Sequence, residues 1–431
     1  MLMKTKTIAF NTLGCKLNFS ETAAISRRFQ DGQFREVGFH EVADIYVINS
    51  CTVTQNAEKR CRELIRKAMK TNPEAHVAVI GCYSQISPAG LAAIPGVALV
   101  LGNTEKYQLF DRLKELAYKP AQDNIVDVSD NTSEAFIPTY STGERTRSFF
   151  KIQDGCDYKC AYCIIPKARG KSRSNTIAAT LATAAEIAET SIKEMVLTGV
   201  NIGDFGKPQG ETFHQLLKEL AAMEKPERIR LSSVEPDLLT EEIIRLVAKE
   251  ERLMPHFHIP LQSGSDSILR AMGRRYNTRL FADRVETIRK HIPHACIAAD
   301  VIVGYPGETE ELFRESLSFL SGMDVSYVHV FSYSERAQTR AADLTDKIHP
   351  KVIKDRAKTL QQLSDKKKQA FAEANKGLTT KVLWEKDRTG DHMSGFTENY
   401  IRVKTKYNEN KVNTIEEVVL NITGKNGVYL V

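Results

Sequence analysis

Three cysteines lie within eight residues in the middle of the chain, in the pattern Cys156-x3-Cys160-x2-Cys163. Three thiolates are one short of the four ligands that close a structural zinc site. They suffice to hold three corners of a four-iron cluster, whose fourth iron stays open to a small molecule with an amino and a carboxylate group. The alternative is a zinc knuckle completed by a distant histidine, His256 or His258. The spacing predicts a metal centre and favours an iron–sulfur cluster.

A second group of cysteines is dispersed along the first third of the chain. Cys15, Cys51 and Cys82 each follow an apolar run that is typical of a β-strand. Because the carboxyl ends of parallel strands share one edge of a sheet, we expect these three thiols to form one site. The alternative is that each is an independent buried cysteine, which is the interpretation that we prefer for Cys61 and Cys296.

The elements that must position these cysteines follow an α/β pattern. In the first third, strand-like and helical runs alternate, which predicts an open parallel sheet over residues 1–120. The predicted strands are residues 7–12, 44–49, 77–81 and 97–101, and the predicted helices are residues 21–30, 57–69 and 105–116. A polar, irregular stretch at residues 121–143 is typical of a linker.

The middle section, residues 144–370, repeats the strand–helix pattern six times and therefore predicts a partial (β/α)6 barrel with its site at the strand carboxyl ends. Its predicted strands are residues 148–153, 195–200, 229–234, 257–261, 297–303 and 327–332, with helices at 178–191, 241–248 and 279–291 among them. The tail, residues 371–431, has short strands at 379–384, 400–404, 415–420 and 427–431 and predicts a small β-barrel.

Charge is placed unevenly along the 431 residues. The formal net charge is +6, and residues 351–431 hold 16 basic and 10 acidic side chains, so the whole excess lies at that end. A second basic focus, residues 145–173, surrounds the tight cysteine group. Each run alone is equally well explained as a solvated face, but two foci beside a reactive site favour a polyanionic substrate.

The amino terminus lacks the apolar region of a secretory signal, and eight cysteines without export predict reduced thiols and a cytoplasmic protein. Residues 75–104 contain no Asp, Glu, Lys or Arg, but turn residues interrupt them, so we predict no transmembrane helix and no membrane partner.

The tight cysteine pattern, with aromatic Tyr162 before the last cysteine, resembles that of the radical S-adenosylmethionine (SAM) enzymes. Together with several further stretches, it resembles the tRNA methylthiotransferases over essentially the whole chain. These stretches are residues 11–16 (Asn-Thr-Leu-Gly-Cys-Lys), 49–54 (Asn-Ser-Cys-Thr-Val-Thr), 81–85 (Gly-Cys-Tyr-Ser-Gln), 151–156 (Lys-Ile-Gln-Asp-Gly-Cys), 163–166 (Cys-Ile-Ile-Pro) and 168–170 (Ala-Arg-Gly). The first and fourth are most similar to the branch that acts on threonylcarbamoyladenosine next to the tRNA anticodon.

This resemblance implies two four-iron clusters, one on Cys156, Cys160 and Cys163 for radical generation and an auxiliary one on Cys15, Cys51 and Cys82 for sulfur donation. It implies two molecules of SAM, methylthiolation of adenine C2 at position 37 of tRNA, and a TRAM-type RNA-binding tail that contacts the anticodon stem-loop. An electron donor and a sulfur source are further partners that the sequence does not identify. Another tRNA adenosine, a ribosomal protein side chain, and a non-catalytic zinc-dependent RNA-binding role are the alternatives.

Two sets of binding residues follow from the same resemblance. The predicted SAM contacts are Tyr162, Thr198, Gly199, Ser232, Ser233, Glu235, Gln262, Ser263, Ile302 and Gly304. The predicted RNA contacts are Lys366, Lys367, Lys368, Arg402 and Lys404.

Overall fold

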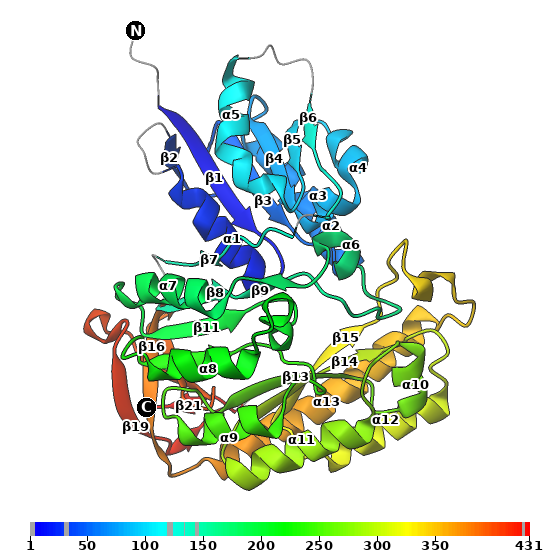
Figure 1. Cartoon of the computed structure of the whole chain (residues 1–431), viewed down its shortest axis with the longest axis vertical. Coiled ribbons are helices and arrows are strands. Elements are labelled where there is room, and N and C mark those ends of the chain that lie inside the picture. Colours follow the sequence, from blue (N-terminus) through cyan, green and yellow to red (C-terminus); the bar gives the residue numbers. More distant parts are fainter. Residues whose placement is uncertain (1–4, 30–33, 119–123, 133, 143–145, 425–426) are drawn as a thin grey trace.

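The computed structural model describes residues 5–29, 34–118, 124–132, 134–142, 146–424 and 427–431. It is an α/β structure with three parts in chain order, which confirms the predicted fold class (Figure 1). In the view of Figure 1 the amino-terminal sheet lies at the top, the strands of the middle section lie below it, and the carboxyl-terminal strands lie at the lower left.

The amino-terminal part is a six-stranded, fully parallel sheet in the order β2-β1-β3-β4-β5-β6. Its strands are β1 (Lys6–Thr12), β2 (Phe34–Glu36), β3 (Ile45–Ser50), β4 (His76–Gly81), β5 (Val97–Leu101) and β6 (Ile125–Asp127). Its helices are α1 (Lys16–Arg27), α2 (Gln55–Thr71), α3 (Cys82–Ile86), α4 (Pro88–Ala92), η1 (Glu105–Gln108) and α5 (Leu109–Tyr118). Because α2 and α4 cover one face and α1 and α5 the other, the central strands are buried on both faces and read as continuous apolar runs.

The middle part contains six parallel strands in two hydrogen-bonded groups, β12-β11-β8 and β13-β14-β15. A bridge between Ser233 and His258 joins the two groups, so that they form the predicted partial barrel. The strands are β8 (Arg147–Lys151), β11 (Glu194–Thr198), β12 (Arg228–Leu231), β13 (His256–Gln262), β14 (Cys296–Val303) and β15 (Tyr327–Ser332). The helices are α6 (Ile165–Arg169), α7 (Ile177–Ala188), α8 (Phe213–Ala222), α9 (Glu241–Lys249), α10 (Asp266–Ala271), α11 (Thr278–His291), α12 (Glu310–Gly322) and α13 (Pro350–Ala374).

Short elements complete the middle part and lie close to the cysteine loop. The two-residue strands β9 (Gln153–Asp154) and β10 (Arg173–Ser174) pair with each other, and β7 (Thr139–Tyr140) pairs antiparallel with β8. The 3-10 turns are η2 (Ile202–Asp204), η3 (Lys207–Gln209) and η4 (Arg340–Asp343).

The tail forms a curled six-stranded sheet in the order β19-β16-β17-β18-β21-β20, which is a half-barrel. Its elements are β16 (Thr379–Thr389), β17 (His392–Thr397), β18 (Arg402–Lys406), η5 (Glu409–Lys411), β19 (Ile415–Val419), β20 (Ile422–Thr423) and β21 (Tyr429–Leu430). Fully buried Trp384 is the centre of its small core. Within the described residues the two outer strands are not hydrogen-bonded to each other, so the sheet curls without closing.

Six strands were not predicted, namely β2, β6, β7, β10, β17 and β20. All of these except β17 have only two or three residues, too few to show a periodicity. In β17, Gly395 interrupts the apolar pattern that would have indicated a strand. A glycine is needed there because a Cβ would lie 2.8 Å from the Trp384 ring. Strand β6 falls within the predicted linker, and α13 runs past residue 371, where the predicted tail begins. No helix in the described ranges combines the length and apolarity that crossing a bilayer requires.

Candidate active site

The loop that carries Cys156, Cys160 and Cys163 lies between β9 and α6, above the carboxyl ends of the barrel strands. The barrel holds the loop at its centre, because the backbone N–H of Ala161 donates to the carbonyl of Met272 at 2.8 Å and its own carbonyl accepts from Ala341 at 2.9 Å. These two hydrogen bonds anchor the loop to Met272, which follows α10, and to Ala341 in η4.

Arg274 is the main charged neighbour of this loop and was missed by the sequence analysis. Its guanidinium lies 3.0 Å from Cys160 Sγ and 3.4 Å from the Tyr162 hydroxyl, and it forms an ion pair with Glu235. Burial raises the pKa of Glu235, and the Arg274 charge only partly offsets that effect. Nothing in the local sequence distinguishes Arg274 from its neighbour Arg275, so only the fold could identify it.

The donor chemistry of the loop fits a cluster. Burial raises the pKa of the Cys156 and Cys163 thiols to about 12, so both are protonated in the metal-free protein. Metal ligation requires the thiolates, and therefore binding releases protons and recovers the cost of burying charge. Cys156, Cys160 and Cys163 would hold three irons and leave the fourth to SAM.

The fold gathers the second cysteine group at one edge of the amino-terminal sheet. Cys15, Cys51 and Cys82 follow β1, β3 and β4, which are neighbours in the sheet. They are close enough for their charges to interact, since burial first and the Cys82 charge next raise the pKa of Cys51, to about 12. Gly14 packs directly on this group, because a Cβ at position 14 would lie 2.9 Å from Cys51 Sγ.

Two asparagines hold the edges of this group, which we call the auxiliary triad. The Cys15 thiol lies 3.8 Å from Asn18 Oδ1, and Asn18 Nδ2 donates to the carbonyl of Ser50 at 3.1 Å, next to Cys51. Asn103 Nδ2 lies 3.7 Å from Cys82 Sγ and 2.5 Å from the carbonyl of Ala168 on α6. The second contact links the auxiliary triad to the segment that follows the barrel cysteine loop.

A buried ion network joins the two domains beside the auxiliary triad. Arg169, only 1% exposed, donates to both carboxylate oxygens of Glu21 at 3.0 Å, to Asp154 at 2.9 Å and to Asn18 Oδ1 at 2.6 Å. Lys106 and Lys151 also contact Glu21, at 2.6 and 3.3 Å. Burial alone would raise the pKa of Glu21, but Arg169, Lys106 and Lys151 together hold it well below its usual range.

A cavity of about 230 Å³ lies where residues of the amino-terminal part meet the barrel. Cys163 lines one wall, and Val53 and Thr54, which follow Cys51 in the chain, line the opposite wall. Three predicted SAM residues also face it, namely Tyr162, Gln262 and Ile302. Gln262 adopts a left-handed backbone conformation (φ 68°), a strained geometry that often marks functional sites.

The other predicted SAM residues are near strand ends but do not line this cavity. Glu235 pairs with Arg274, Ser233 Oγ lies 2.9 Å from His258 Nδ1, and Ser232 Oγ is buried without a partner in the described structure. Thr198 Oγ1 contacts the carbonyl of Val196, and Ser263 Oγ accepts from the Ser265 N–H. Gly199 packs against Gln153 Oε1, and Gly304 packs against Ile353 on α13. Their role in SAM binding stays a prediction.

The predicted RNA residues divide into three groups. Lys367 donates to the carbonyl of Met323 at 2.7 Å and thereby caps α12, so its position has a structural reason. Lys368 and Arg402 line a second cavity of about 480 Å³ between β15, α13 and the tail sheet. Lys366 is exposed and Lys404 half-buried. RNA contact by these side chains stays a prediction.

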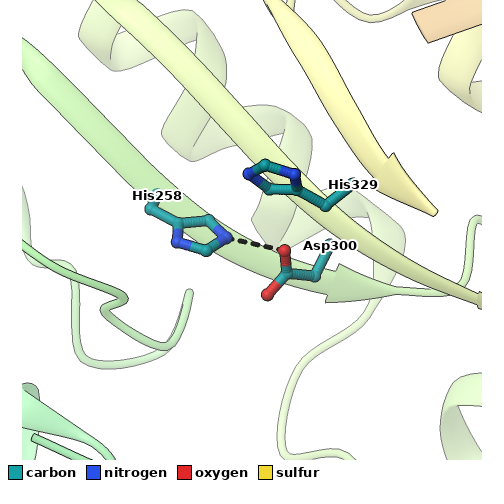
Figure 2. A group of neighbouring side chains, drawn as sticks. All are labelled: His258, Asp300 and His329. Carbon is teal, nitrogen blue, oxygen red and sulfur yellow. Dashed lines mark hydrogen bonds and ion pairs between the residues drawn. The ribbon is translucent and has the colours of Figure 1, made fainter. Parts of the chain in front are cut away.

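Neither histidine of the zinc alternative is placed to complete the barrel cysteine site. His258 forms hydrogen bonds with Ser233 and Asp300. His256 is buried against the Tyr400 ring, with 4.6 Å between the ring centroids. Within the described ranges, the only three His, Cys or carboxylate groups whose ligand atoms lie within 4.8 Å of one another are His258, Asp300 and His329 (Figure 2). The cysteine sulfurs are thus spread more widely than a single zinc ion requires.

Comparison with known proteins agrees with this geometry. Residues 150–320 match the radical SAM superfamily, and residues 7–102 match an uncharacterized protein family, UPF0004. The fold and the cysteine loop thus define a radical SAM enzyme with an additional amino-terminal domain.

Proteins similar to this chain over most of its length specify the family within the radical SAM enzymes. The chain is 37% identical to the threonylcarbamoyladenosine tRNA methylthiotransferase MtaB of Bacillus subtilis, over 96% of this chain and 93% of that protein. It is 38% identical to the Aquifex aeolicus protein of the same name, over 92% and 96%, respectively. A tRNA-2-methylthio-N(6)-dimethylallyladenosine synthase of Nitratidesulfovibrio vulgaris is 32% identical, over 89% and 87%. The chain belongs to the tRNA methylthiotransferase family of radical SAM enzymes, which excludes the non-catalytic zinc-binding alternative.

Solved structures share the fold. The radical SAM methyltransferase TsrM of Kitasatospora setae matches with a TM-score of 0.56 at 14% identity, over 79% of this chain and 77% of that one. The cobalamin-dependent radical SAM enzyme OxsB matches with a TM-score of 0.52 at 14% identity, over 84% and 56%, respectively. At this identity the likeness concerns the arrangement of the chain alone.

Proposed function

We propose that the protein methylthiolates C2 of the adenine in N6-threonylcarbamoyladenosine at position 37 of tRNA. In this proposal it uses two SAM molecules and two four-iron clusters, held by Cys156, Cys160 and Cys163 and by the auxiliary triad. The observation that carries the proposal is the cavity that Cys163 lines together with Val53 and Thr54, which are two and three residues after Cys51. The names of the first five relatives support the choice of substrate.

The chemistry of the target explains why two sites must face one cavity. An aromatic C–H has no useful acidity, so a general base is inadequate for this substitution. When bound, the clusters and SAM supply the radical that removes the hydrogen and the methylated sulfur that replaces it. The protein must therefore bring one carbon atom within reach of both sites.

The chain's own residues perform the positioning. Tyr162, Ile302 and Phe331 make much of the cavity wall apolar, which keeps water away from a reactive species. The Arg274 guanidinium, fixed by Glu235, orients Cys160 and Tyr162. Lys368 and Arg402 line the second cavity, of about 480 Å³, where they can hold phosphates. The target base leaves its stack at a cost of about a few kcal/mol.

Anaerobically reconstituted protein, incubated with SAM, a reductant, a sulfide source and bulk tRNA, tests the proposal. We expect mass spectrometry of the digested nucleosides to show a methylthio group on threonylcarbamoyladenosine. Ribosomes are assayed in parallel. A methylthio product only on another adenosine, or only on a ribosomal protein, would contradict the proposed substrate. Loss of the same nucleoside from cells that lack the protein is the expected result in vivo.

A further inference from the structure

Asn103 stands between Cys82 of the auxiliary triad and the buried ammonium of Lys106. Its Oδ1 accepts from Lys106 Nζ at 2.9 Å, and its Nδ2 lies 3.7 Å from Cys82 Sγ, within hydrogen-bond range of a sulfur acceptor. An ammonium only donates, so the amide oxygen must face Lys106 and the amide N–H groups must face the sulfur. Because an amide whose oxygen binds a cation is a stronger donor, Asn103 transmits the Lys106 charge to Cys82.

Asn18 has the same place on the other side of the auxiliary triad. Its Oδ1 accepts from Arg169 Nη2 at 2.6 Å and lies 3.8 Å from Cys15 Sγ. Its Nδ2 donates to the carbonyls of Leu13 at 2.7 Å and Ser50 at 3.1 Å, which fixes the amide to the ends of β1 and β3. The Arg169 guanidinium is therefore held directly behind Cys15, with only the amide oxygen between them.

Cations outnumber carboxylates in this buried network. Its buried cations, each only 1% exposed, are Arg169, Lys106 and Lys151. In the described part of the chain they face two buried carboxylates, Glu21 and Asp154. The more exposed Arg173 adds a further positive charge, 3.2 Å from Asp154. Because an unpaired buried charge costs free energy, the network calls for a negative group nearby.

The three thiols of the auxiliary triad are the neighbouring groups that can supply this negative charge. As thiolates that hold a four-iron cluster, they outweigh the positive charge of the oxidised core, and reduction adds one more negative charge. The reduction potential of such a cluster depends on the net charge around it and on hydrogen bonds to its sulfurs. The wall behind the auxiliary triad provides both.

The barrel cysteine loop differs in this respect. The Arg274 guanidinium, 3.0 Å from Cys160 Sγ, has its own carboxylate partner in Glu235, so one cation faces one anion there. Helix α6 connects the two sites, because it begins two residues after Cys163 and packs against α3, which begins at Cys82 (Figure 1). The surplus of cations is thus placed on the auxiliary side of this connection.

We propose that Lys106 and Arg169 are the counter-charges of the auxiliary cluster and raise its reduction potential. Each acts through the asparagine beside it and touches neither the substrate nor a sulfur, so both are positioning residues. The inference rests on the proposed function, because it requires the auxiliary cluster. A cation stabilises the reduced, more negative form of an anionic centre more than the oxidised form, so removal of either cation lowers the potential.

An EPR-monitored redox titration of the auxiliary cluster tests this assignment. The C156A/C160A/C163A chain, reconstituted anaerobically, carries only this cluster, so a single signal is titrated. In that chain K106Q, which keeps a hydrogen-bond donor without the charge, is expected to lower the ratio of reduced to oxidised cluster about 10-fold at a given potential. This corresponds to a shift of about 59 mV to more negative values for a one-electron couple. N103A, which removes the link to Cys82, should shift the potential in the same direction.

Two further variants separate charge from packing. K106R keeps the charge and should keep most of the unsubstituted potential, and K67Q, which removes an exposed lysine of α2, is the matched control. Equal potentials for K106Q and K67Q would overturn the inference. Equal shifts for K106Q and K106R would also overturn it, since they would assign the effect to packing. Where K106Q binds no cluster, N103A is compared with K67Q and decides by the same criterion.

Failure of the inference and failure of the proposed function give different results. A C156A/C160A/C163A chain that binds no four-iron cluster would remove the auxiliary site and the inference together. Potentials that shift as expected, with wild type forming a methylthio product only on another base or on a protein, would contradict the proposed substrate. In that case the assignment of the counter-charges would stand.

Discussion

The two cysteine groups each contain three thiols, but the chain brings those thiols together in different ways. Cys156, Cys160 and Cys163 come from eight consecutive residues, so one loop places all three. The auxiliary triad comes from the ends of three neighbouring strands, and its members are up to 67 positions apart, from Cys15 to Cys82. A local site depends on the conformation of one segment, whereas an assembled site depends on the packing of an entire sheet.

The charges beside the two groups differ in the same sense. At the loop, one guanidinium, that of Arg274, faces Glu235, and burial of the carboxylate prevails, so its pKa is raised. At the auxiliary triad, three cations surround Glu21 and lower its pKa well below the usual range. The auxiliary triad is thus the group that has an interdomain ion network beside it. Its cysteines are far apart in the chain, so tertiary contacts such as this network must hold them together.

Removing the ligands of each group has the largest expected effect. C156A/C160A/C163A should abolish both deoxyadenosine and methylthio product. C15A/C51A/C82A should abolish methylthio product only, because the radical site stays intact, and iron should fall from about eight to about four per chain. Iron analysis and product assays after anaerobic reconstitution measure both.

C61A/C296A is the matched control for these variants, because both cysteines are buried and belong to neither group. It should keep about eight irons. Deoxyadenosine from the C156A/C160A/C163A protein would refute the assignment of the radical site, and eight irons in the C15A/C51A/C82A protein would refute the auxiliary one.

R169Q should destabilise the metal-free protein by about 3–5 kcal/mol at pH 7, because it leaves Glu21 and Asp154 buried and only partly paired. The difference depends on pH with a definite sign. Opposing the effect of burial, the cations lower the pKa of both carboxylates from their ordinary values of 4.5 and 3.8. Their contribution is therefore complete above about pH 4.5 and is lost as the pH falls. Urea unfolding at several pH values measures it.

R314Q serves as the control, since its ion pair with Glu310 is exposed on α12 and is expected to contribute within about 0.5 kcal/mol. A stability difference between R169Q and wild type that did not shrink on acidification would show that the network contributes through packing and not through charge.

Gly14→Ala has the smallest expected effect and tests how closely the assembled site is packed. Both Gly14 (φ 96°) and Gly210 (φ 72°) have left-handed backbones, but a Cβ meets Cys51 at 2.7 Å in the first case and nothing within 4 Å in the second. G210A should lose only about 1–2 kcal/mol of unfolding free energy through backbone strain. G14A should lose more and also bind less auxiliary iron. Equal iron content in the two variants would contradict the contact.

How much of the fold and of the site could be predicted depends on how far apart in the sequence the residues of each feature lie. The six barrel strands and the loop cysteines follow from local runs and spacing. The structure has each predicted strand within two residues at either end, except that the first is divided into β8 and β9 and that β12 ends three residues before the predicted end at residue 234. Short edge strands such as β2 escaped because three residues carry no periodicity. Arg274 and the cluster of His258, Asp300 and His329 escaped because their partners are far away in the chain.

The sequence by itself determined the two sets of cysteines, the alternation of strands and helices, and the basic tail, since these are written in neighbouring residues. Only the tertiary structure decided which arginine faces which cysteine, and that one cavity is lined by Cys163 together with Val53 and Thr54 of the amino-terminal part. The reason is physical: local propensity acts over a few residues, whereas burial and Coulomb interactions depend on distances in space that the order of residues does not specify.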